Sequence, residues 1–258
     1  MRVLRPGLAA VAASLLLAAC GGGGGPGGPP PVQGSPLARH PATDLAAQQA
    51  VEEMRAHLIA ASRSYLNGKV KFATAHMAAA KTEYATITSA VRTRDAALDR
   101  EFHAAFGLIG GEIAQKAPAP DVMNRMGLMQ GQLLDAAVQD SVSGRGLNDP
   151  GLAALVMTRL ADEGSRDYAI AAQEGFTDRG RRAYQDSFGL ITRASTISHQ
   201  ISASFGPEGN TIVGSLNDAH TIGFPTGILL PREMPAAKLS ADVARARAAV
   251  SRRFGFSA

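Results

Sequence analysis

The sequence predicts an all-α protein, an up-and-down bundle of about four long helices followed by shorter helices and a long irregular loop. Three observations support this prediction. Alanine is abundant, whereas tryptophan is absent and aromatic residues make up only 5% of the chain. Apolar residues recur every three or four positions over most of residues 43–143, in stretches of roughly 20 residues. Helices of this length with short connections are typical of a bundle.

The first helix is expected to begin with Thr43 or Asp44 as its N-cap. It should end at Asn67-Gly68, because glycine suits the left-handed position that follows many helices. Its apolar positions are spaced by three and four and therefore lie on one face: Ala47, Val51, Met54, Leu58, Ala61 and Tyr65. A second helix is predicted from about residue 70 to residue 91.

The third helix is predicted over residues 95–116 and ends where the prolines of "APAPD" stop it. The fourth helix, over residues 121–142, is rich in methionine and leucine. Thioether side chains can bind soft metals, but they more often fill irregular gaps in a core. With no cysteine beside them, we interpret the methionines as core residues and the four helices as a bundle over residues 43–143.

A second helical region is predicted over residues 150–258. Asp149 followed by Pro150 is typical of an N-cap and the first helical position. Shorter helices are expected over residues 150–162, 165–174 and 178–204, and a last one over residues 240–254. Residues 205–238 are rich in glycine and proline yet apolar, so they are expected to form a functional loop or a packed irregular segment.

The amino-terminal residues have the pattern of a bacterial lipoprotein leader. Two arginines precede a short apolar run, and Leu17-Ala18-Ala19-Cys20 has the form of a lipobox. We therefore expect a signal peptide over residues 1–19, lipid on Cys20 and a flexible Gly/Pro-rich tether over residues 20–42. The alternative is an ordinary secretory signal followed by a chance cysteine.

This leader predicts a periplasm-facing protein of the cell envelope, held to a membrane by its lipid. Gly at position 21, in place of Asp, favours the outer membrane over the inner one. The formal net charge of +4 includes two arginines of the leader, so it is weak support for nucleic-acid binding. No second long apolar run follows. Nucleophile elbows, zinc-protease motifs, phosphate loops and paired cysteines are all missing, so no enzymatic activity is predicted.

Two stretches resemble known iron-uptake proteins. The first is "SYLNGKVKFATAHMAAAKTEYATITSAVRTRDAALDREFHAAFGLIGGEI" and the second is "RDYAIAAQEGFTDRGRRAYQDSFGLITRA". Both are similar to the periplasmic helical modules of bacterial iron permeases of the iron/lead transporter family, and imelysin-like lipoproteins share this style of module. The resemblance implies a helical envelope protein that handles iron. The chain departs from these families in two ways. The permeases have two glutamates in a Gly-Phe-Glu-x-x-Glu segment before the junction that begins here at Arg92, and both are uncharged residues in this chain. The His-x-x-Glu motif of imelysins is missing.

Several acids and histidines have a spacing that suits a divalent cation. Asp95, Asp99 and His103 are four residues apart and fall on one helix face. Glu53 with His57, and His76 with Glu83, show similar patterns on the first two helices. If these faces converge, they could form a metal site in the bundle core. The alternative is that they are solvated helix faces, with Asp95 and Asp99 favoured by the helix dipole.

The sequence-based hypothesis is a lipid-anchored binding protein that is an accessory to metal uptake, with iron or another divalent cation as its ligand. The residues predicted to bind the cation are Asp95, Asp99, His103, Asp167 and Asp186. The alternative is a scaffold lipoprotein without a metal that docks an envelope protein through residues 205–238.

Overall fold

The computed structural model describes residues 42–256. The predicted signal peptide, the predicted lipidation site Cys20 and nearly all of the predicted tether lie outside these described residues. The described part is helical and contains no strand, so the predicted all-α class is confirmed. It belongs to one compact unit. None of its helices is both long enough and apolar enough to cross a bilayer.

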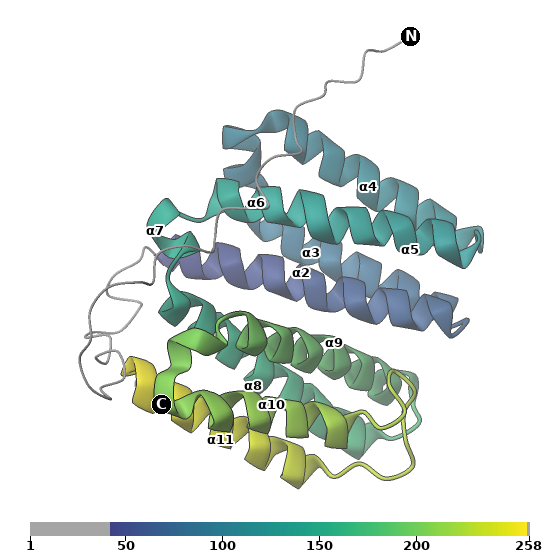
Figure 1. Cartoon of the computed structure of the whole chain (residues 1–258). Helices are drawn as coiled ribbons and strands as arrows, with labels where there is room; N and C mark the ends of the chain where they lie inside the picture. Colours follow the sequence, from purple (N-terminus) through teal and green to yellow (C-terminus); the bar gives the residue numbers. More distant parts are fainter. Residues whose placement is uncertain (1–41, 257–258) are drawn as a thin grey trace. The chain divides into compact units, whose positions relative to one another are not determined.

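The helices follow one another with short connections (Figure 1). In chain order they are α2 (Ala42–Leu66), α3 (Val70–Arg94), α4 (Ala96–Ala114), α5 (Ala119–Leu128), the π-helical turn η1 (Met129–Leu133), α6 (Leu134–Ser141), α7 (Gly144–Leu147), α8 (Pro150–Glu174), α9 (Asp178–Gln200), the 3₁₀ segment η2 (Ser202–Glu208), α10 (Gly209–Gly223) and α11 (Ala236–Phe254).

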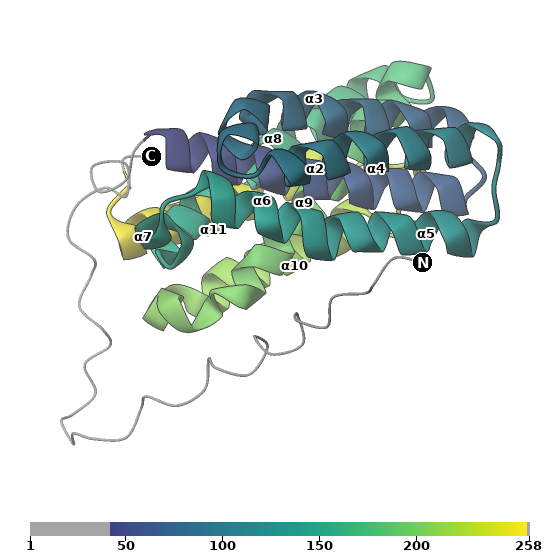
Figure 2. The same cartoon turned by 90° about the horizontal axis from the view of Figure 1, so that it is seen from above.

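The first of two hydrophobic clusters lies among α2, α3, α4 and the α5–η1–α6 segment. These helices run alongside one another in the view of Figure 2. The ring of Tyr84 in α3 stacks on Phe102 in α4 with 4.3 Å between their centroids, and Phe106 packs beside both. Met126 and Met129 are buried in this cluster, as expected for methionines that fill a core.

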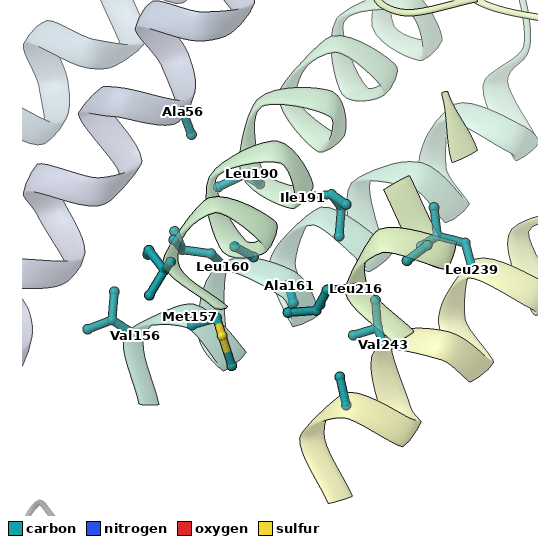
Figure 3. Packing of buried hydrophobic residues seen from close by; sticks show 14 of the residues in the cluster. Ala56, Val156, Met157, Leu160, Ala161, Leu190, Ile191, Leu216, Leu239 and Val243 are labelled. Carbon is teal, nitrogen blue, oxygen red and sulfur yellow. The ribbon is translucent and has the colours of Figure 1, made fainter. Parts of the chain in front are cut away.

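The second cluster joins α8, α9, α10 and α11, and it also takes residues from α2. Figure 3 shows Ala56 of α2 beside Leu190 of α9, with Ile191 and Leu216 deeper in the same cluster. Helix α2 therefore contributes one face to each cluster. The ion pair between Glu52 of α2 and Arg193 of α9, both largely buried, connects the same two helices.

The prediction of an irregular loop over residues 205–238 is wrong for much of its length. Residues 209–223 form α10, and the connection to α11 is limited to residues 224–235. Ile212, Leu216 and Ala219 have helical spacing and are all buried. Gly223 suits a close contact, because a Cβ there would lie 2.5 Å from Leu239 Cδ1. Burial of the apolar face therefore outweighs the low helix propensity of the glycines.

Other predicted boundaries need smaller corrections. Residues 150–174 form one continuous helix, because the small Gly164 allows α8 to pack closely on Ile191. The predicted fourth helix is divided by the π-helical turn η1. Asp44 is not an N-cap: it lies inside α2, is buried and accepts a hydrogen bond from the backbone N–H of Ser143 (3.1 Å).

Candidate metal centre

Three ligand-type side chains from three helices meet between the two clusters. They are His57 of α2, His76 of α3 and Asp186 of α9. Asp186 Oδ1 lies 3.3 Å from His57 Nδ1 and 3.1 Å from His76 Nδ1. One ligand atom from each residue lies within 4.8 Å of the others, and His76 is fully buried. Among residues 42–256 this is the one group of three or more such side chains with that geometry.

The facing atoms of this centre make no hydrogen bond with one another. Despite the short distances, neither Nδ1 atom nor Asp186 Oδ1 has a partner with hydrogen-bond geometry, and all three atoms are buried. Buried polar atoms are normally satisfied, and here that requires either protonated histidines paired with Asp186 or a cation shared by the three atoms. A cation held between them would be a common partner.

A second layer of contacts orients His76. Its Nε2 lies 3.0 Å from Oε1 of the buried Gln185, which also accepts a hydrogen bond from the Ser64 hydroxyl. Because an amide oxygen only accepts, His76 Nε2 carries the proton. In the neutral imidazole the lone pair is then on Nδ1, which faces Asp186. Two electron-rich atoms at this distance require a proton or a metal cation between them.

Four further carboxylates surround these residues and interact electrostatically with them: Glu53, Glu83, Glu163 and Asp167. Burial is the main cause of the higher pKa of Glu53, which rises to about 7 with help from the neighbouring Glu83. Burial, followed by the charges of Asp186 and Glu163, likewise raises the pKa of Asp167 to about 7. The centre thus lies among carboxyl groups that hold their protons more tightly than usual.

The histidine–aspartate contact changes the pKa of both groups in the directions expected for opposite charges. Burial by itself would lower the pKa of His57, but the contact with Asp186 outweighs it and raises that pKa. Burial would raise the pKa of Asp186, but His57 and His76 lower it well below its ordinary value. Asp186 is therefore anionic at neutral pH.

Helical spacing explains how each element presents its polar residues. Glu53 and His57 are four residues apart on α2, and Glu163 and Asp167 are four apart on α8, so each pair shares one face. His76 and Glu83 are seven apart on α3, which places them two turns apart on the same face. The polar stripes of four helices thereby face one interior region.

The structure places the five residues that were predicted as ligands in two separate regions of the fold. Asp186 belongs to the centre, and Asp167 is one of the surrounding acids. Asp95 is instead the N-cap of α4, because its side chain accepts the backbone N–H groups of Ala97 and Leu98.

The other two proposed ligands lie on α4, which contributes no residue to this centre. Asp99 accepts hydrogen bonds from the Tyr84 hydroxyl (2.8 Å) and from Arg92 Nε (2.7 Å). His103 Nε2 is 3.5 Å from Asp99, and its side chain is half exposed. Within the described residues, these α4 side chains do not form a group of three ligands.

His57 and His76 are the functional candidates that were not among the proposed ligands. Their signal was the Glu53–His57 and His76–Glu83 spacing, which indicated faces that could converge. The sequence contained nothing that joined those faces to Asp186 of a helix more than 100 residues later.

Comparison of the chain with protein-family models, with curated proteins and with solved structures finds no match.

Proposed function

We propose that this protein binds a divalent transition-metal cation at His57, His76 and Asp186. The observation that carries the proposal is the meeting of three buried ligand atoms without hydrogen bonds between them. Two imidazoles and one carboxylate are a ligand set that suits Fe²⁺ and Zn²⁺.

The distances suit neighbouring ligands of one metal ion. Metal–nitrogen and metal–oxygen bonds are about 2.1 Å long, so two ligands at right angles are roughly 3 Å apart. The observed Nδ1–Oδ1 distances of 3.1 Å and 3.3 Å are close to that value. Gln185 supports the same geometry, because its bond to Nε2 orients the His76 ring and leaves Nδ1 free to bind a metal.

The charge of the site favours a cation. Asp186 is anionic, and Glu53, Glu83, Glu163 and Asp167 are nearby carboxyl groups whose ionised form a bound cation would stabilise. Carboxylate oxygens in this number favour iron or manganese over the softer copper(I). Open coordination positions would be filled by water or by one of these acids.

The predicted lipoprotein leader supports a location for this activity in the cell envelope. A lipid on Cys20 and the tether that follows would hold the helical unit at a membrane surface. Together with the resemblance to iron-permease and imelysin-like modules, this supports an accessory role in metal uptake, with iron as the leading ligand. It is a binding role, and we propose no catalytic activity.

The test is cation binding by the purified protein, with each of Fe²⁺, Zn²⁺, Co²⁺ and Mn²⁺, measured by calorimetry and by the visible absorption of Co²⁺. We expect one tightly bound cation per chain. The variants His57→Ala, His76→Ala and Asp186→Asn should each weaken binding by at least tenfold.

His103→Ala is the matched control, because it removes a half-exposed histidine of the other proposed set. Its affinity should equal that of the unchanged protein. Equal affinity in all three site variants, or no binding of any of the four cations, would contradict the proposal.

A second candidate function is docking of an envelope partner. Phe176 and Leu229 are exposed by 57% and 43%, and both line a hollow with Lys69 and Arg181 at the α8–α9 end of the fold. This surface includes only part of the predicted loop, because residues 209–223 form α10. Substitution of both residues by serine should abolish recovery of a specific envelope protein in pull-downs from membranes; unchanged recovery would reject docking at this surface.

A further inference from the structure

A cleft of about 440 Å³ opens on the surface where α2, α3 and α8 meet. Its polar lining consists of Gln49 and Glu53 from α2, Glu83 and Thr86 from α3, and Arg159 from α8. Glu53 and Glu83 are only partly buried, whereas His76 is closed to solvent. The cleft therefore exposes two carboxylates that belong to the acidic surroundings of the candidate metal centre.

Hydrogen bonds connect the rim of this cleft to its acidic side chains. Arg159 Nη1 donates to Gln49 Oε1 (2.9 Å), and Gln49 Nε2 donates to Glu53 Oε1 (2.7 Å). Glu53 in turn interacts with Glu83 and with His57, which lies one helical turn further along α2. A continuous series of polar groups thus runs from the surface to the first histidine of the centre.

The opposite approach has the wrong charge for a cation. A second hollow lies near Gln185, which contacts His76 from the other side, but its charged residues are Lys69 and Arg181. Arg182 Nε is also 3.8 Å from Asp186 Oδ2. The second hollow therefore has two positive side chains, whereas the cleft has two carboxylates and the single positive charge of Arg159, so a cation is attracted to the cleft.

We propose that divalent cations reach His57, His76 and Asp186 through the cleft between α2, α3 and α8, and that Glu53 and Glu83 are the groups that first capture them. This inference rests on the proposed function, because it names the route to that same site. Arg159 holds Gln49 at the rim, and its charge slows the entry of cations.

The experiment measures the rate of Co²⁺ association with the full chain by stopped-flow absorption, at low and at high ionic strength. The double variant Glu53→Gln/Glu83→Gln keeps the side-chain shapes but removes the charges. Its association rate should fall about tenfold at low salt, and the difference should shrink at high salt because salt screens the charges. Arg159→Gln should bind faster than the unchanged protein.

Arg181→Gln is the matched control on the opposite side of the site, because Arg181 lines the second hollow. It removes a similar charge, so a gain in association rate as large as that of Arg159→Gln would overturn the route. An unchanged association rate in the double variant would also overturn the route, whether or not the dissociation rate changes.

The two proposals can fail separately. If the unchanged protein binds Co²⁺, and binding needs His57 and His76, but the double variant loads at the normal rate, only the route is rejected. If the unchanged protein binds no cation, or if His57→Ala and His76→Ala bind normally, the metal centre itself is rejected. Circular dichroism of each variant establishes that the helical fold is retained.

Discussion

Gly189 of α9 lies directly against the backbone of Ala56 in α2. A Cβ atom on Gly189 would overlap the Ala56 carbonyl oxygen and would lie 2.9 Å from its carbonyl carbon. Gly189 is three residues after Asp186, and Ala56 is the residue before His57. The closeness of these two backbones therefore sets how near the carboxylate and the imidazole can lie.

Replacing Gly189 by alanine should destabilise the fold and weaken the metal centre together. The added methyl group must push α9 away from α2, and overpacking of this kind costs about 1–3 kcal/mol. Urea unfolding should show this loss, and Co²⁺ affinity should fall in the same variant. Gly214→Ala is the control: nothing lies within 4 Å of its added Cβ, so it should be neutral or stabilise α10 by up to about 1 kcal/mol. Equal stability of both variants would contradict this view of the α2–α9 contact.

The Glu52–Arg193 pair offers a second test of the same helix contact. Both side chains are about nine-tenths buried, with 9% and 11% exposed. Arg193→Ala should lower the free energy of unfolding by about 3 kcal/mol, because it leaves a buried carboxylate without its main partner. The double variant Glu52→Gln/Arg193→Met removes both charges and should recover part of that loss. Denaturant unfolding measures both, and a double variant less stable than Arg193→Ala would exclude this explanation.

The cation-free protein should become less stable as pH rises from about 5 to 8. Glu53 and Asp167 have folded pKa values of about 7, above their ordinary values of 4.5 and 3.8. The folded state therefore binds more protons than the unfolded state within this window, and stability decreases until both groups are ionised. The raised pKa of His57 acts in the same direction above its ordinary value of 6.5. Thermal unfolding should show a fall of several degrees in Tm.

Two changes should reduce that pH dependence. The variants Glu53→Gln and Asp167→Asn remove the groups that ionise, so their Tm should vary less between pH 5 and 8. A bound cation should raise Tm more at pH 8 than at pH 5, because protons compete with it for the site. A Tm that rises with pH in the cation-free protein would show that the carboxylates are not crowded as described.

Asp99 should matter for stability and not for cation binding. The Tyr84 hydroxyl, on a side chain that is 1% exposed, donates to Asp99, and Tyr84→Phe should cost about 1 kcal/mol by removing that bond. Asp99→Asn should lower Tm, because the neutral amide no longer forms an ion pair with the Arg92 guanidinium. Calorimetric titration of both variants with Co²⁺ should give the affinity of the unchanged protein. Weaker binding in either variant would favour the ligand set on α4 that the sequence suggested.

The helices themselves could be predicted where apolar spacing was regular. The ends at Asn67-Gly68 and Asp149-Pro150 agree with the end of α2 and the start of α8, because capping and breaking residues act locally. Residues 209–223 were missed because their glycines lower helix propensity, and only burial against α9 and α11 makes that helix favourable. The π-helical turn at Met129–Leu133 has no signal in the sequence that we can identify.

By itself, the sequence determined the all-α class, the approximate helices and which residues share a face of each helix, because all of these depend on neighbours within a few positions. Only the tertiary structure decided which polar faces meet. It joined His57 and His76 to Asp186 and left Asp95, Asp99 and His103 on another helix pair. The physical reason is that periodicity sets the direction of a side chain around its own helix axis, whereas the neighbour that it meets depends on close packing between distant segments, such as that of Gly189 against Ala56.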